Sequence, residues 1–89
     1  MTAQIIVQGM VQGVGYRFYV VELARQYSIR GYVQNLPNGR VAVVAEGDKG
    51  ILNDFIERLR IGSTSAHVTG IDVKWSEEEC GFKDFDVRF

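Results

Sequence analysis

The sequence predicts an α+β protein with a ferredoxin-like βαββαβ sandwich, in which two helices cover one face of an antiparallel sheet. Three observations predict this fold class. Two segments have helical periodicity, several others alternate apolar and polar residues, and a tight-turn sequence joins two of the alternating segments. The chain has 89 residues, of which 46% are hydrophobic, so it can bury one modest core. We therefore expect residues 1–89 to form a single domain.

The two expected helices are amphipathic and cover Tyr16 to Ser28 and roughly Lys49 to Ile61. In each, apolar residues recur at spacings of three and four, which places them on one face. These residues are Val20, Leu23, Ala24 and Tyr27 in the first helix, and Leu52, Phe55, Ile56 and Leu59 in the second. We expect Asp48 to cap the start of the second helix and Gly62 to follow its end.

The strands are indicated by segments in which apolar and polar side chains alternate, as in half-buried strands. The apolar members are Ile5 and Val7; Ile29, Gly31 and Val33; Val41, Val43 and Ala45; Ile71, Val73 and Trp75; and Phe85, Val87 and Phe89. The sequence Leu36-Pro37-Asn38-Gly39 is typical of a type I turn with a bulge. We therefore expect the second and third strands to form a hairpin.

The charge and composition exclude several classes of partner. The chain has ten Lys and Arg residues and eleven Asp and Glu residues, so its formal net charge is -1. No broad positive field is therefore available to bind nucleic acid or an anionic membrane. Cys80 is the single cysteine, so no internal disulfide can form. Cys80 and His67, the single histidine, are too few ligands for a usual structural zinc site, and we interpret both residues as incidental to function. No membrane-spanning run or N-terminal targeting pattern is present. We expect a cytoplasmic monomer.

A glycine-rich segment, Gly9-Met10-Val11-Gln12-Gly13-Val14-Gly15-Tyr16-Arg17, joins the first strand to the first helix. Such a turn can point several backbone N–H groups into one concavity, beside a helix N-terminus that favours an anion. The segment lacks the Lys-Ser/Thr ending of a Walker A loop, and Phe18 stands where a dinucleotide fingerprint needs glycine. The helix dipole repels Arg17 unless an anion lies between them. The segment is therefore either a phosphate or carboxylate cradle, or a turn whose arginine is merely solvated.

A second segment, Gly31-Tyr32-Val33-Gln34-Asn35, ends the second strand before the hairpin turn. The uncharged side chain of Asn35 can donate and accept hydrogen bonds at once, which suits a residue that positions water. The simpler alternative is that Asn35 only helps to form the turn.

Together, the two segments resemble the two signature segments of the acylphosphatase family. The similarity includes Gly39, Val41 and Glu46-Gly47 after the second segment, and it extends to the chain length, the order of elements and the second helix. One departure is Gly62-Ser63-Thr64-Ser65, where family members often carry a Gly-Pro pair. This departure affects the shape of that loop, which lies away from the two segments, and we expect activity to survive it.

The resemblance implies an enzyme that hydrolyses acyl phosphates to a carboxylate and inorganic phosphate without a metal or cofactor. By position, it implies that Arg17 and Asn35 are the catalytic residues, with Asn35 orienting the attacking water. It also implies that the backbone amides of the loop bind the phosphate, from Gln12, Gly13, Val14, Gly15, Tyr16 and Arg17. Neither segment contains a histidine, carboxylate or thiol, which favours direct attack by water over a phosphoenzyme.

Two alternatives share the expected fold. Arg30-Gly31-Tyr32-Val33 superficially resembles the start of an RNA-binding motif, but it lies on the second strand, whereas such modules carry the motif on the third. The other alternative is a small-ligand module that recognises carbamoyl phosphate, because similar units occur inside larger hydrogenase-maturation proteins. The fold alone cannot separate these functions, whereas the segments with Arg17 and Asn35 favour the enzyme.

Overall fold

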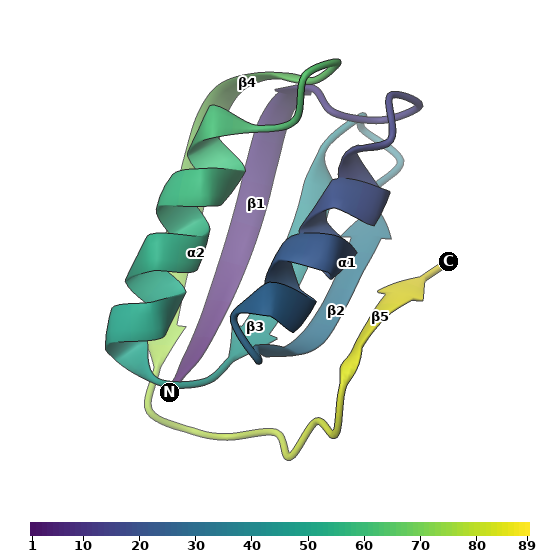
Figure 1. Ribbon diagram of the computed structural model, residues 1–89. Helices are drawn as coiled ribbons and strands as arrows, with labels where there is room; N and C mark the ends of the chain where they lie inside the picture. Colours follow the sequence, from purple (N-terminus) through teal and green to yellow (C-terminus); the bar gives the residue numbers. More distant parts are fainter.

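The computed structural model describes all 89 residues, which form seven helices and strands. Their order is β1 (Thr2–Met10), α1 (Tyr16–Gln26), β2 (Arg30–Asn35), β3 (Val41–Glu46), α2 (Lys49–Ile61), β4 (His67–Ser76) and β5 (Phe85–Arg88). The strands form one sheet in the order β4-β1-β3-β2-β5, and both helices pack on the same face of it (Figure 1). The ferredoxin-like α+β prediction is confirmed.

The core lies between the helices and the covered face of the sheet. Its residues are apolar, and they come from the periodic positions of the helices and the alternating positions of the strands. Phe55 of α2 and Phe85 of β5 meet edge to face, with ring centroids 6.3 Å apart, so the last strand contributes to the same core as the second helix. No helix is long and apolar enough to cross a membrane.

The sheet is mixed, which differs from the expected antiparallel arrangement. β1 pairs antiparallel with β3 and β4, and β2 pairs antiparallel with β3, but β5 runs parallel to β2. The reason is the connection formed by residues 77–84, which crosses from β4 at one edge of the sheet to the opposite edge (Figure 1). The chain therefore enters β5 from the same end as it enters β2. Alternating side chains predict a strand but not its direction.

The first helix ends at Gln26, two residues earlier than predicted. The N–H of Ile29 donates to the carbonyl of Ala24 at 2.8 Å, and the N–H of Ser28 donates to that of Arg25 at 3.2 Å. This pair of bonds is a Schellman motif, in which the residue after the cap takes a left-handed conformation. Ser28 does so with a φ of 55°. Glycine usually occupies this position, so the end of the helix could not be recognised from a serine at residue 28.

The second helix has the predicted bounds, but its cap differs from the prediction. Asp48 is the N-cap residue, yet its carboxylate makes no capping hydrogen bond, and only its backbone carbonyl accepts from Leu52. Gly62 follows the helix as expected, with a φ of 78°. The predicted hairpin is also confirmed, because the N–H of Leu36 donates to the carbonyl of Arg40 at 2.8 Å across the turn.

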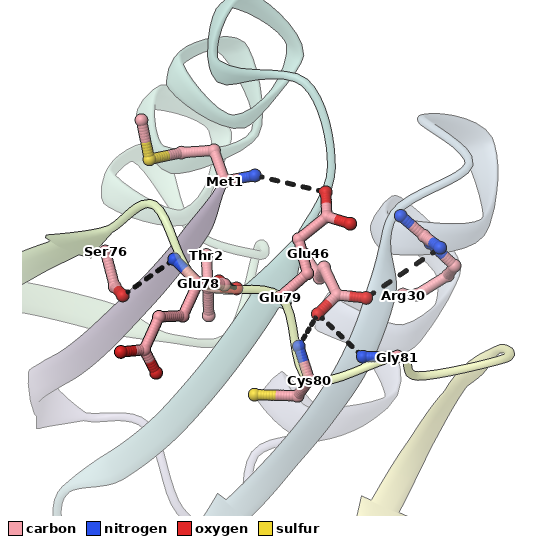
Figure 2. Close-up of polar contacts among 9 residues, drawn as sticks. All are labelled: Met1, Thr2, Arg30, Glu46, Ser76, Glu78, Glu79, Cys80 and Gly81. Carbon is pink, nitrogen blue, oxygen red and sulfur yellow. Dashed lines mark hydrogen bonds and ion pairs between the residues drawn. The ribbon is translucent and has the colours of Figure 1, made fainter.

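A buried carboxylate fastens the connection 77–84 to the end of β3 (Figure 2). Glu46 is fully buried, and its Oε2 accepts hydrogen bonds from the backbone N–H groups of Cys80 and Gly81. Its Oε1 lies 3.8 Å from Nη1 of Arg30. Nearby, the hydroxyl of Thr2 donates to the carbonyl of Glu78 at 2.6 Å. The connection is therefore attached to β1 and β3 before it reaches β5.

We expect Glu46→Gln to lower the free energy of unfolding by about 2 kcal/mol, because it weakens hydrogen bonds from two N–H groups to a charged acceptor. Urea denaturation measures the change. The matched control is Glu57→Gln, which removes an exposed carboxylate 3.5 Å from Arg60 and should change stability by less than about 0.5 kcal/mol. Equal effects of the two substitutions would contradict a special role of the buried carboxylate.

Candidate active site

The loop between β1 and α1 takes its shape from glycines in left-handed conformations. Gly13 has a φ of 74° and Gly15 a φ of 79°. A Cβ atom at either position would meet no atom within 4 Å, so the backbone conformation, and not crowding, accounts for glycine there. These turns lead directly into the first turn of α1, as the sequence predicts.

The N-terminus of α1 keeps backbone donors that no side chain satisfies. Gly15 is the N-cap residue and has no side chain to offer, and the first turn contains no acidic residue. The N–H of Tyr19 is the first in the helix to bond within it, to the carbonyl of Gly15 at 3.1 Å. The N–H groups that precede it have no partner within the helix. They carry the positive end of the helix dipole, which favours an anion.

A pocket of about 180 Å³ opens at this point of the surface. It is lined by Val11, Gly13, Gly15, Tyr16, Arg17 and Phe18. Four of the residues that were predicted to bind phosphate therefore line the same pocket: Gly13, Gly15, Tyr16 and Arg17. The pocket also includes Val11 and Phe18, neither of which was predicted to bind phosphate.

The charge of Arg17 is not neutralised by any carboxylate of the protein. Its guanidinium makes no ion pair, and its Cζ lies 5.4 Å from the ring centroid of Phe89, an exposed residue at the C-terminus. A cation over an aromatic face is attracted to the ring, but its charge remains available to an anion. Because a cation in the first helical turn is also repelled by the helix dipole, an anion in the pocket would relieve this repulsion.

The side chain of Gln12 joins the loop to the hairpin. Its amide Nε2 donates to the backbone carbonyls of Leu36, at 2.7 Å, and of Arg40, at 2.8 Å. Leu36 directly follows Asn35, so these bonds hold the glycine-rich loop beside the end of β2. Gln12 was predicted to contribute its backbone amide, and no local pattern predicts this side-chain bridge across 24 and 28 residues.

Asn35 occupies the last position of β2, opposite Val41 of β3. Its side-chain oxygen Oδ1 is buried and has no hydrogen-bond partner. An unsatisfied buried acceptor is costly and uncommon, which is typical of a group that binds something from solution. Asn35 does not line the pocket itself, and neither do Gln12 and Val14.

Neither His67 nor Cys80 lines the pocket. His67 is exposed at the start of β4, and the exposed Cys80 lies on the connection that follows β4. No three histidine, cysteine, aspartate or glutamate side chains come together in an arrangement that could hold a metal ion.

Tyr16 supports the pocket from beneath. Its side chain is buried, and its hydroxyl donates to the carbonyl of Leu59 at 2.9 Å, near the end of α2. Burial raises the pKa of this phenol well above its usual value, and the neighbouring phenol of Tyr19 raises it further. The hydroxyl therefore stays protonated at physiological pH and remains a donor. This contact ties the first turn of α1 to the second helix.

We expect Tyr16→Phe to lower the free energy of unfolding by about 1 to 2 kcal/mol, because it removes a buried hydrogen bond. The matched control is Tyr19→Phe, whose hydroxyl donates to the carbonyl of Arg58 at 2.8 Å in an exposed position. Water can replace that exposed bond, so the control should cost less than about 0.5 kcal/mol. Chemical denaturation compares the two, and a larger loss for Tyr19→Phe would refute the assignment.

Comparisons with known proteins agree on one family. The sequence model of the acylphosphatase family matches residues 3–87. An acylphosphatase of Thermus thermophilus is 46% identical over 82 residues, which covers 92% of each chain. The crystal structure of acylphosphatase from Bacillus subtilis superposes with a TM-score of 0.97 at 38% identity and covers 99% of this chain and 98% of that one.

A larger protein contains a similar unit. The crystal structure of full-length HypF in its phosphate- and nucleotide-bound form matches with a TM-score of 0.90 at 29% identity, over 99% of this chain but only 12% of HypF. The curated relatives, in contrast, match along nine tenths or more of their own length. The full-length matches and the match of the family model show that the chain belongs to the acylphosphatase family.

Proposed function

We propose that this protein hydrolyses acyl phosphates, the mixed anhydrides of a carboxylic acid and phosphoric acid, to a carboxylate and inorganic phosphate. Membership of the acylphosphatase family supports this activity. The site assignment rests on the pocket at the N-terminus of α1. Backbone N–H groups without a partner and the unpaired guanidinium of Arg17 lie together there. We propose residues 1–89 as one acylphosphatase domain, and a cytoplasmic location remains a prediction from the sequence.

In this proposal the phosphoryl group lies in the glycine-rich loop. The backbone N–H groups of residues 12–17 donate to its oxygens, and the planar guanidinium of Arg17 offers two parallel hydrogen bonds. Phosphoryl transfer depends mainly on positioning and on stabilisation of charge at the phosphoryl oxygens. An acyl phosphate also has a good leaving group, so the carboxylate can depart without a strong acid from the protein.

The attacking water is held by Asn35. The side-chain amide of Asn35 can donate and accept hydrogen bonds at once, and through such a bond it orients a lone pair of the water toward phosphorus. The bridge from Gln12 to the carbonyls of Leu36 and Arg40 keeps this amide beside the loop. Phosphorus gains a bond to the water oxygen as its bond to the acyl oxygen breaks, and the water proton passes to solvent.

The two alternatives are not favoured, because the relatives that match along their whole length are acylphosphatases. In addition, β3 carries no aromatic side chain on which a base could stack. A salt-dependent titration with single-stranded RNA is expected to show no binding.

The test compares phosphate release from benzoyl, acetyl and carbamoyl phosphate with that from p-nitrophenyl phosphate, in the presence of EDTA. We expect hydrolysis of the acyl phosphates and little of the monoester, because the monoester has the poorer leaving group. Equal rates on the monoester would contradict the proposal. Loss of all activity in EDTA would contradict a mechanism that uses only the side chains and amides of the protein.

A further inference from the structure

Phe18 is an exposed aromatic ring at the rim of the proposed phosphate pocket. It lies in the first turn of α1, directly after Arg17, and 71% of its surface is exposed although it lines the pocket. Single exposed apolar side chains are common on protein surfaces. Phe18 is distinguished from the others by its position, because it also lines the pocket.

Phe18 also differs from the other phenylalanines of the chain. Phe55 and Phe85 contact each other, Phe82 contacts Tyr32, and Phe89 lies over the guanidinium of Arg17. Phe18 alone makes no aromatic or cation–π contact. Most of its ring therefore remains free to contact a ligand.

The chemistry of the proposed substrate supplies a partner. An acyl phosphate held by its phosphoryl oxygens in the loop must direct its bridging oxygen, and hence its acyl group, out of the cradle toward the rim. At the rim the group meets a phenyl ring, which an aliphatic or aromatic acyl chain would cover. Burial of apolar area and ring-to-ring contact both favour a large apolar acyl group over a small one.

We propose that Phe18 is the acyl-binding surface of the site and makes it selective for aromatic and other large apolar acyl phosphates. This inference rests on the proposed function, because it assumes that the phosphoryl group occupies the loop. Phe18 is a specificity residue here. It contacts the acyl group and not the reacting phosphorus, so its removal should affect large substrates and leave small ones almost unchanged.

The experiment measures kcat/KM for benzoyl phosphate and acetyl phosphate in the wild type, Phe18→Ala and Phe18→Leu. For Phe18→Ala we expect a fall of about ten-fold on benzoyl phosphate and less than about two-fold on acetyl phosphate, with Phe18→Leu between the wild type and Phe18→Ala. Inhibition by inorganic phosphate should not change. The control Ile51→Ala, which truncates an exposed apolar side chain in the first turn of α2, should behave as the wild type on both substrates.

Equal losses on the two substrates, or no loss on either, would overturn the inference. A binding measurement keeps it testable even if the proposed activity fails. Calorimetry with phenylphosphonate and methylphosphonate should show tighter binding of the phenyl compound in the wild type, and that preference should disappear in Phe18→Ala. Equal binding of the two compounds by the wild type would refute the acyl surface without bearing on hydrolysis. Absence of hydrolysis of every acyl phosphate would refute the proposed function alone.

Discussion

Replacement of Arg17 by lysine is expected to lower kcat/KM for benzoyl phosphate by about 100-fold, nearly as much as replacement by alanine. Lysine keeps the positive charge but loses the planar fork that donates two parallel hydrogen bonds. The guanidinium makes no ion pair with a carboxylate, and Arg17 lines the pocket, so its two parallel donors are available to a bound phosphoryl group. An ammonium group can reproduce the charge at this place but not the geometry.

The measurement is steady-state hydrolysis of benzoyl phosphate by purified Arg17→Lys and Arg17→Ala, with urea denaturation to show that both variants fold. Arg60→Lys on the exposed face of α2 is the matched control and should keep the wild-type rate. A rate for Arg17→Lys close to that of the wild type would show that charge alone is sufficient, and the proposed two-point contact would be wrong.

Replacement of Asn35 by alanine should lower kcat by about 100-fold while inhibition by inorganic phosphate changes less than about three-fold. The reason is that, in the proposed mechanism, the amide orients the water and does not hold the phosphoryl group. Its Oδ1 is already buried without a partner, so alanine removes an acceptor that the fold does not use. We therefore expect the variant to be no less stable than the wild type, which separates a functional from a structural role.

Gln34→Ala, at the neighbouring position of β2, serves as the control and should leave both kcat and phosphate inhibition unchanged. The opposite pattern for Asn35→Ala, in which phosphate inhibition disappears and turnover persists, would mean that the roles of Asn35 and Arg17 are reversed.

The periodic parts of the fold could be predicted from the sequence because burial leaves a repeating signal. The bounds of α2 agree with its apolar spacing, and Pro37 and Gly39 mark the hairpin turn. The end of α1 was missed because Ser28 adopts a conformation that usually marks a glycine. The direction of β5 was missed because it depends on the path of the connection 77–84, which no local pattern records.

The site was predictable in its residue types but not in its supporting contacts. The glycines and Arg17 could be proposed because their local chemistry is unusual for a helix start. The exposure of Phe18 beside them was not predicted, because it depends on how the loop and the first helical turn are shaped. The bridge from Gln12 to the hairpin was not predicted either, because it depends on which distant segments lie side by side, and a single sequence does not carry that information.

The path of the connection 77–84 has a consequence for how the chain folds. The β2–β3 hairpin is the only ladder between neighbouring segments of the sequence, whereas β1 must meet β4 and β2 must meet β5 across most of the chain. Contacts of such high sequence separation slow folding, because the entropy of closing a long loop is lost before the pairing is gained. We therefore expect this chain to fold more slowly than a helical bundle of its length. Until residues 77–88 dock, the outer edge of β2 has no neighbouring strand.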